Sequence, residues 1–299
     1  MIKKTFYSIF QKGSKTYFYS SLFFPTNIKK DVFELYAFVR KADNFVDSIP
    51  QDSEGFYDFK NKYHLAIEGE ETGDVVVDSF VELANKKGFE HKWIDAFLDS
   101  MEMDLKNVKY HSLQDTIEYI YGSAEAIGLM MAKIMNLPKE SYPYARILGR
   151  AMQYINFIRD IAEDIELGRT YFPSSDFKEF GLNSLQQNEI LNNPDEFRNF
   201  IHRQIQRYCQ WQNYAEQGYK YIPKRYLISV KTASEMYYWT ALQINKNPFI
   251  VYEWKVKPLI IQILTTTLKN IIDPSKPQFK PIIHKPPKTV INYCQQRFF

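Results

Sequence analysis

The stretch LGRAMQYINFIRDIAEDIELGRTYFP at residues 148–173 decides the fold class of this chain. Its apolar residues recur at helical spacing, and we expect one helix over residues 139–167. Gln153, Asn156, Asp160 and Asp164 lie at offsets of 0, 3, 7 and 11 residues, so they share one face of that helix. The stretch therefore predicts a core helix with a polar edge that ends in two carboxylates four residues apart.

The stretch LYAFVRKADNFVD at residues 35–47 repeats this plan. Tyr36, Arg40, Asp43 and Asp47 lie at offsets of 0, 4, 7 and 11 residues and again share one helix face. An arginine that can hold an anion therefore stands one turn before a second pair of aspartates. We expect this helix to cover about residues 28–47 and to end before Pro50.

Each aspartate pair places two like charges about 5–6 Å apart on a helix edge. This repulsion is unfavourable on a solvated face, but divalent cations that bridge the carboxylates to a phosphate-bearing ligand would relieve it. Magnesium suits such a site because it prefers oxygen ligands and shares substrate phosphates, and manganese is the alternative. Taken alone, such a pair is more often surface decoration, and only the flanking residues favour a site.

Strand signals are scarce in the rest of the chain, and helical periodicity recurs throughout. We expect an all-α fold with a single-domain helical bundle over residues 1–272, in which a central apolar cavity has a polar mouth. Thr26 and Asn27 offer an N-terminal cap for the helix expected over residues 28–47. The other expected helices cover about residues 52–69, 74–87, 90–104, 112–136, 193–221, 227–245 and 250–272.

Composition excludes several classes of protein. The chain has 299 residues, 45% of them apolar, and a formal net charge of +3, which argues against a nucleic-acid-binding protein. Cys209 and Cys294 lack CxxC spacing, so neither a disulfide framework nor a zinc site is expected, and a reducing cytoplasm fits. No signal peptide and no apolar stretch of about 20 residues is evident. We expect a cytoplasmic protein that is soluble or at most peripheral to a membrane.

The C-terminal residues 273–299 form a proline-rich basic tail, which we expect to be extended or disordered. The apolar run PLIIQIL at residues 258–264 precedes this tail. Two interpretations stay open: a packed terminal helix with a solvated tail, which burial tendencies favour, and peripheral association with an anionic membrane surface.

Four segments together resemble the squalene and phytoene synthase family, most closely its bacterial and archaeal phytoene or dehydrosqualene synthase branch. These segments cover residues 14–25, 35–47, 119–135 and 148–173. The motif NxxRDxxED followed by GRxYxP in the last segment is highly specific. The resemblance implies an isoprenoid-synthase bundle, a prenyltransferase of isoprenoid biosynthesis, with prenyl diphosphates as its substrates.

The reaction that the resemblance implies is head-to-head (1′–1) condensation of two prenyl diphosphates through a cyclopropyl diphosphate. The expected reaction converts two geranylgeranyl diphosphates to phytoene in carotenoid biosynthesis, and NADPH is not expected. The alternatives are dehydrosqualene or squalene from two farnesyl diphosphates, and a non-catalytic prenyl-lipid-binding or assembly protein of the same fold. A head-to-tail prenyltransferase is disfavoured because Asp43-Asn44 is not the doublet of a DDxxD motif.

Residue roles follow from the resemblance position by position. The implied metal ligands are Asp43, Asp47, Asp160 and Asp164, with Asn156 and Glu163 beside them. The implied contacts to substrate diphosphate are Ser14, Lys15, Thr16, Tyr36, Arg40, Asn156, Arg159 and Arg169. Tyr121 and Gln153 would line the reaction centre, and Tyr237 or its neighbour Tyr238 would line the pocket. Arg159 has an alternative role in a helix salt bridge with Glu163.

Three departures from the family pattern affect the pocket. Glu125 in SAEAIG replaces a small residue, and it either alters product specificity or points away into solvent or an ion pair. Gly13 replaces a frequent histidine, and no arginine stands near Trp254. The floor of the pocket is expected among residues that are individually more often core than substrate wall, namely Phe23, Phe38, Ile127, Met131 and Phe157.

Overall fold

The structure is a computed structural model that describes residues 2–274. These residues form helices joined by short loops and contain no strand, so the all-α prediction is confirmed. The α-helices are α1 (Lys4–Gly13), α2 (Lys15–Ser21), α3 (Thr26–Asp47), α4 (Ser53–Ile67), α5 (Val75–Lys87), α6 (His91–Leu105), α7 (Leu113–Ile120), α8 (Ala126–Ile134), α9 (Tyr142–Arg159), α10 (Ile161–Glu166), α11 (Ser174–Glu179), α12 (Gln187–Asn192), α13 (Pro194–Glu216), α14 (Lys224–Lys246), α15 (Ile250–Glu253) and α16 (Ile260–Ile272). Three short helical turns are the π-turn η1 (Tyr121–Glu125) and the 3₁₀ turns η2 (Lys139–Ser141) and η3 (Gln217–Tyr221).

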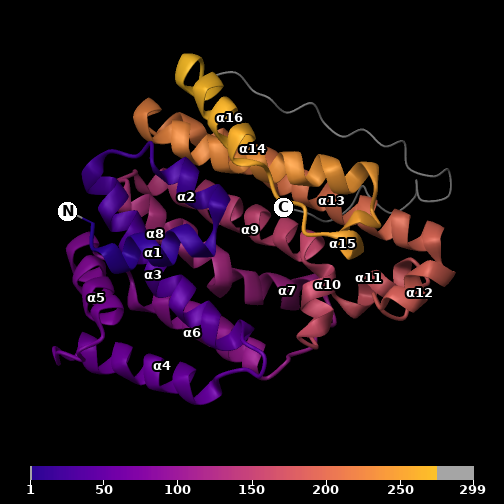
Figure 1. The fold of residues 1–299 in the computed structure, drawn as a ribbon, viewed down its shortest axis with the longest axis horizontal. Helices are drawn as coiled ribbons and strands as arrows, with labels where there is room; N and C mark the ends of the chain where they lie inside the picture. Colours follow the sequence, from indigo (N-terminus) through magenta and orange to yellow (C-terminus); the bar gives the residue numbers. More distant parts are fainter. Residues whose placement is uncertain (1, 275–299) are drawn as a thin grey trace.

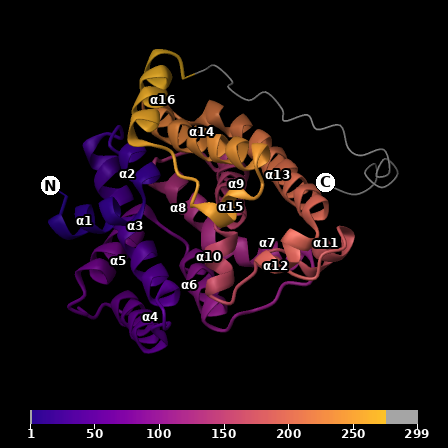
Figure 2. The same ribbon diagram turned by 45° about the vertical axis from the view of Figure 1, so that its right-hand side comes forward.

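Helix α9 occupies the middle of the bundle (Figures 1 and 2). It packs against α8 on the side of the N-terminal helices and against α13 and α14 on the side of the C-terminal helices. The buried apolar residues divide accordingly into one cluster built mainly from α1 to α8 and another built mainly from α7 and α9 to α15. The two halves of the bundle thus meet along α9, the helix that carries the second aspartate motif.

Helix α3 starts two residues earlier than predicted and ends at Asp47, as predicted. Its N-cap is Pro25, and no side chain caps it, so the expected cap at Thr26 and Asn27 is wrong. Proline serves here because its ring fixes φ, which is −54° in this residue. One face of α3 is buried in the N-terminal cluster, and this orients the opposite, polar face.

Four predicted helices are divided in the structure, and one of them, residues 193–221, forms α13 followed by the 3₁₀ turn η3. Residues 139–167 form η2, α9 and α10, with a bend at Asp160 (φ −100°, ψ 15°). The backbone hydrogen bonds from Asp160 N–H to Asn156 and from Asp164 N–H to Asp160 continue through the bend, both at 2.8 Å, so the polar stripe survives it. Residues 112–136 contain the π-turn η1, and residues 250–272 are interrupted before α16, where Pro258 removes a backbone donor.

Four short helices, α1, α2, α11 and α12, have no counterpart among the predicted helices. They have between 6 and 10 residues, too few for a clear helical period to stand out in the sequence. The extent of a single domain stays a prediction, and the predicted tail lies almost wholly outside the described residues. No helix in the described part of the chain is long and apolar enough to cross a bilayer.

Helix α9 closely approaches the π-turn η1 at Gly149, and α8 closely approaches α9 at Gly128. A Cβ atom on Gly149 would lie 2.4 Å from the carbonyl oxygen of Ala124, and one on Gly128 would lie 2.3 Å from that of Ala145. The neighbours in both cases are backbone atoms, which move only if a helix moves. Both glycines also line the cavity described below, so this contact fixes the spacing of two of its walls.

We expect Gly149→Ala to lower the free energy of unfolding by about 1–3 kcal/mol, because the added methyl group forces α9 away from the π-turn η1. Without that clash the same change would stabilise the helix by up to about 1 kcal/mol, since alanine favours helix more than glycine does. Urea unfolding followed by circular dichroism gives the sign directly. A more stable variant would show that the two backbones do not touch at Gly149.

Candidate active site

A cavity of about 910 Å³ runs through the bundle between α2, α3, α8, α9 and α14. Along α3 its wall changes from Val32 and Leu35 to Asp43 and Asp47, over about 22 Å at 1.5 Å per residue. Along α9 and α10 the wall changes in the same way, from apolar residues to the second aspartate pair. The cavity therefore has one charged end, which includes half-exposed carboxylates, and one buried apolar end.

At the charged end, α3 presents the first aspartate pair. Arg40 lies 4.0 Å from the carboxylate of Asp43, one turn away on the same face. The ring of Tyr36 stacks on that of Phe10 with 3.8 Å between ring centres. A Cβ atom on Gly13 would lie 2.3 Å from the hydroxyl of Tyr36, so the loss of a side chain at residue 13 makes room for Tyr36.

The second pair is held by cations from two elements. Arg159 donates two hydrogen bonds to Asp160, of 2.7 and 2.5 Å. Lys255 lies 3.2 Å from Asp160 and also pairs with Glu163. The proposed salt bridge between Arg159 and Glu163 is therefore wrong, because Lys255 from the link after α15 takes Glu163.

Arg169 joins the two aspartate motifs. Its guanidinium donates to Asp47 Oδ1 at 2.8 Å and to the carbonyl of Val46, and its backbone N–H donates to the carbonyl of Asp164 at 2.7 Å. The side chain is only 4% exposed. Arg169 lines the cavity, as predicted for a phosphate partner, but its guanidinium is bonded to the C-terminal end of α3.

A fifth aspartate, Asp104 on α6, also lines the cavity. It accepts hydrogen bonds from the hydroxyls of Tyr119 (2.7 Å) and Tyr171 (2.9 Å) and is 4% exposed. Sequence analysis missed Asp104, Lys255 and Lys257, all of which line the cavity. Each of these residues lies outside a recognisable motif. The hydrogen-bond partners of Asp104 are 15 and 67 residues away in the sequence, so no local spacing predicts that it belongs to the site.

The carboxylates at this end differ in their electrostatics. Burial, followed by the charge of Asp47, raises the pKa of Asp43 to about 7, and burial raises the pKa of Asp104 to about 6. Burial and the neighbouring Asp160 also raise the pKa of Asp164. Burial acts in the same direction on Asp160, but the charges of Arg159 and Lys255 outweigh it and lower its pKa. The site thus holds buried acids whose ionised forms would be favoured by additional positive charge.

We expect the metal-free protein to lose stability as the pH rises from about 5 to about 7. The folded state holds the Asp43 proton up to a pKa of about 7, whereas the unfolded chain releases it near the ordinary 3.8, so deprotonation favours unfolding in this range. Melting temperatures measured in EDTA across this range test the sign. Asp43→Asn should reduce the slope, and an unchanged slope would show that Asp43 does not carry the effect.

The donor set fits magnesium in its usual mode of binding. Within residues 2–274, no group of three or more His, Cys, Asp or Glu side chains could hold a metal ion. Magnesium commonly takes one or two carboxylates and completes its shell with water and substrate phosphate oxygens, which is the size of set that each pair supplies. Asn156 adds a buried amide oxygen, Oδ1, that has no hydrogen-bond partner among the described residues.

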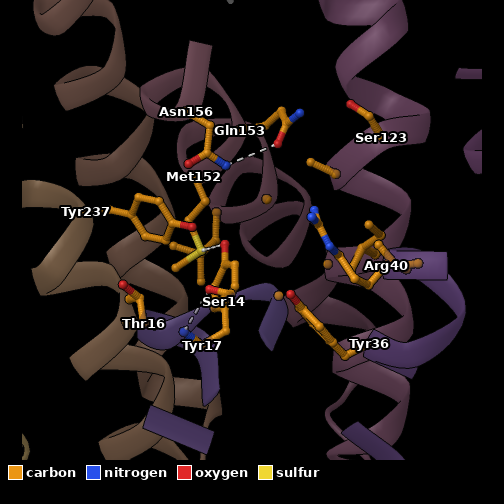
Figure 3. A pocket seen from close by; sticks show the side chains of 18 of the residues that line it. Ser14, Thr16, Tyr17, Tyr36, Arg40, Ser123, Met152, Gln153, Asn156 and Tyr237 are labelled. Carbon is orange, nitrogen blue, oxygen red and sulfur yellow. Dashed lines mark hydrogen bonds between the residues drawn. The ribbon is translucent and has the colours of Figure 1, made fainter. Parts of the chain in front are cut away.

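The structure brings fifteen of the sixteen predicted site residues to the cavity wall. They are Ser14, Lys15, Thr16, Tyr36, Arg40, Asp43, Asp47, Gln153, Asn156, Arg159, Asp160, Glu163, Asp164, Arg169 and Tyr237. Figure 3 shows Tyr237, Thr16 and Ser14 on one side of the pocket, Arg40 and Tyr36 on the other, and Gln153 and Asn156 between them. Of the two candidate tyrosines, Tyr237 lines the cavity and Tyr238 does not.

Tyr121 is the exception and is not among the lining residues. Its ring lies 5.3 Å from the guanidinium of Arg146, in the π-turn η1. A π-turn is wider than an α-helical turn and shifts which residues face a given side. Ser123 from the same turn lines the cavity instead, with a buried hydroxyl that has no hydrogen-bond partner within residues 2–274.

Glu125 does not line the cavity either. It is fully buried and pairs with Arg146 at 2.8 Å and with Arg150 at 2.6 Å, so of its two interpretations the ion pair holds. Among the expected floor residues, Ile127, Met131 and Phe157 line the cavity. Phe23 does not, and Phe38 is a core residue stacked on Phe80 at 3.8 Å.

Comparison with known proteins names the family. A sequence model described as squalene/phytoene synthase matches residues 10–261. The chain belongs to the squalene/phytoene synthase family. It is accordingly an enzyme that transfers prenyl groups, by head-to-head condensation of prenyl diphosphates.

Three relatives show how far this family likeness extends. A 15-cis-phytoene synthase of Pantoea ananas is 27% identical over 237 residues, which is 75% of this chain and 76% of that protein. A 4,4′-diapophytoene synthase of Staphylococcus haemolyticus is 26% identical over 182 residues, 59% of this chain and 64% of that protein. The crystal structure of a dehydrosqualene synthase in complex with ligand has a TM-score of 0.73 at 19% identity and covers 90% of this chain and 97% of that one. This last likeness shows the squalene/phytoene synthase fold.

Proposed function

We infer that this squalene/phytoene synthase joins two geranylgeranyl diphosphates head to head into phytoene, with magnesium and without NADPH. The observation that carries this proposal is the graded cavity of about 910 Å³, which has both aspartate pairs at one end and apolar side chains at the other. Such a volume is near the upper end of the range of about 300–1,000 Å³ that is usual for ligand pockets. It matches substrates that carry a diphosphate at one end of a long hydrocarbon chain.

The cationic side chains at the charged end would bind the diphosphate. Lys15, Arg40, Arg159 and Lys257 line it from four different segments of the chain. Burial lowers the pKa of Lys257, and the charges of Lys255 and Arg159 lower it further. A bound diphosphate would relieve this repulsion around Lys257.

Magnesium, or manganese in its place, would be held by Asp43 and Asp47 on one wall and by Asn156, Asp160, Glu163 and Asp164 on the other. Its chemistry there is to neutralise the diphosphate as the bond to the allylic carbon breaks. Carboxylates that are buried and short of positive charge suit this role, because the bound cation keeps them ionised.

The chain itself protects and steers the allylic cation. Tyr17, Tyr36, Phe157 and Tyr237 line the cavity, and aromatic faces attract cations. The rings of Tyr17 and Tyr237 lie 5.5 Å apart, and Tyr17 contacts the sulfur of Met152 at 3.6 Å (Figure 3). Once substrate fills the cavity, this aromatic lining would shield the cation from water, which would otherwise quench it.

The length of the prenyl chain depends on the apolar end. Phe24, Met131, Met135 and Leu137 line it, and the hydroxyls of Ser20 and Ser21 are turned back onto the carbonyls of Tyr17 and Phe18. Small side chains in α2 thus leave depth for a long chain. The likeness to the Pantoea phytoene synthase supports the twenty-carbon substrate, and the likeness to the diapophytoene synthase supports farnesyl diphosphate as the alternative.

The proposal is tested by incubating the purified protein with magnesium and either geranylgeranyl or farnesyl diphosphate, each with and without NADPH. We expect phytoene from geranylgeranyl diphosphate at a rate that NADPH does not change. Dehydrosqualene or squalene as the main product would move the chain to the farnesyl branch. Release of diphosphate without any joined hydrocarbon would contradict the condensation itself.

A further inference from the structure

Lys255 connects the C-terminal part of the chain to the second aspartate motif. Its ammonium group lies 3.2 Å from Asp160 and also pairs with Glu163, and its side chain is 25% exposed. Within residues 2–274, Lys255 is the only cation outside α9 and α10 that forms an ion pair with this motif. We build here on the proposed function, in which the same two carboxylates help to hold magnesium.

The ammonium group of Lys255 competes with a metal ion for the oxygens of Asp160. One of these oxygens, Oδ1, lies 3.2 Å from Lys255 and accepts a hydrogen bond of 2.7 Å from Arg159. Magnesium binds a carboxylate oxygen directly, at about 2.0–2.1 Å, and its two charges repel an ammonium group this close. Arg159 belongs to α9 and stays beside Asp160, whereas Lys255 comes from another segment and has to leave.

The segment that carries Lys255 has few ties to the rest of the protein. Residues 254–259 join α15, which packs against α10 (Figure 2), to α16, and we call them the α15–α16 link. Within the described part of the chain, no backbone–backbone hydrogen bond involves residues 255–258. Val256, 3% exposed, anchors the link in the C-terminal apolar cluster. A segment held in this way moves at a low cost in free energy, so Lys255 can leave the carboxylates without disturbing a helix.

The cavity offers Lys255 a second partner when diphosphate is bound. Lys255, Lys257 and Pro258 from the link all line the charged end of the cavity. Phosphate oxygens carry more negative charge than a carboxylate and form strong, charge-assisted hydrogen bonds with ammonium groups. The bound diphosphate would therefore accept the ammonium group of Lys255 as it leaves Asp160 and Glu163.

We propose that Lys255 is a resident counter-ion of the second aspartate motif, and that it moves to the diphosphate so that Asp160 and Glu163 become free to bind magnesium. Without diphosphate, Lys255 keeps both carboxylates paired and the affinity for metal low. Diphosphate and metal thus favour each other's binding by equal factors, in addition to their direct contact. The enzyme completes its metal site only around a bound substrate.

The test is manganese binding to the full-length, substrate-free protein, measured from the EPR signal of the free ion. Lys255→Met should raise the affinity about fivefold or more, because two carboxylates lose their competing partner. The matched control is Lys60→Met, which should leave the affinity unchanged. Lys60 is 22% exposed and also bridges two acids three residues apart, Asp99 and Glu102, but none of the three lines the cavity.

Lys257→Met distinguishes displacement from a general effect of charge. Lys257 lines the same end of the cavity, but it forms no ion pair in the part of the chain that the structure describes. Its removal should therefore raise the affinity for manganese less than the removal of Lys255 does. A gain in Lys255→Met no larger than that in Lys257→Met would overturn the proposal.

Inorganic diphosphate supplies the second measurement. It should raise the manganese affinity of the unmodified protein about fivefold more than that of Lys255→Met, whose carboxylates are free from the start. The affinity of diphosphate for manganese in solution is common to both proteins and cancels in this comparison. Equal gains in the two proteins would show that diphosphate does not take up Lys255, and the proposal would fall.

Asp160→Asn separates this proposal from the proposed function. Unchanged manganese binding in Asp160→Asn would place the metal elsewhere, and the proposed metal site would fail together with the role of Lys255. Weaker binding in Asp160→Asn, with no effect of Lys255→Met, would leave the metal site standing and overturn the exchange alone. Melting temperatures check that every variant is folded. Because no prenyl substrate is present, these outcomes are independent of whether the enzyme makes phytoene.

Discussion

Asp43→Asn and Asp160→Asn, made singly, are each expected to lower kcat/KM by about 10²–10³-fold. The two carboxylates lie on opposite walls of the charged end of the cavity, on α3 and between α9 and α10. Each substitution keeps the shape of the side chain but removes a negative oxygen that would hold magnesium against the diphosphate. Steady-state rates at several magnesium concentrations measure both the loss and any increase in metal requirement.

The matched control is Asp58→Asn, which removes an exposed carboxylate that pairs with Lys62 on α4. It should leave kcat/KM unchanged. Circular dichroism should show the same helix content in all three variants. Unchanged turnover in Asp43→Asn or Asp160→Asn would place the metal elsewhere in the protein.

Arg169→Met is expected to lower the free energy of unfolding by about 2–4 kcal/mol and to abolish turnover. The buried guanidinium pairs with Asp47, bonds the carbonyl of Val46 and lies near the buried Asp104. Its removal leaves these acids without their cation and frees the C-terminal end of α3 from the second motif. This loss of unfolding free energy is smaller than is usual for breaking a fully buried ion pair, because Asp47 is itself 42% exposed.

Two further variants separate charge from simple packing. Arg169→Lys keeps the charge but not both hydrogen bonds, so it should recover part of the stability. Arg198→Met removes a pair with Asp195 in which both side chains are exposed, and it should cost less than about 1 kcal/mol. Chemical denaturation of all three variants gives these values. A loss no larger in Arg169→Met than in Arg198→Met would contradict the bridging role of Arg169.

The local parts of the site followed from the sequence. The offsets of Asp43 and Asp47, and of Asp160 and Asp164, put each pair on one helix edge, because helical geometry fixes the relation of residues within three turns. Of the sixteen site residues that were then predicted with the help of the family resemblance, fifteen line the cavity. It failed at Tyr121, where a π-turn changes the direction of side chains and leaves no mark in the hydrophobic period.

By itself, then, the sequence determined an all-helical chain with two carboxylate stripes and the family to which it belongs. Only the tertiary structure decided that Lys255 neutralises Asp160 and Glu163, that Asp104 joins the charged end, and that Arg169 ties one motif to the other. The tertiary structure also turned Glu125 away into an ion pair and left the apolar side of α16 exposed. The physical reason is the same in each case. These contacts join residues far apart in the chain, and they depend on how whole helices pack rather than on the period within any one of them.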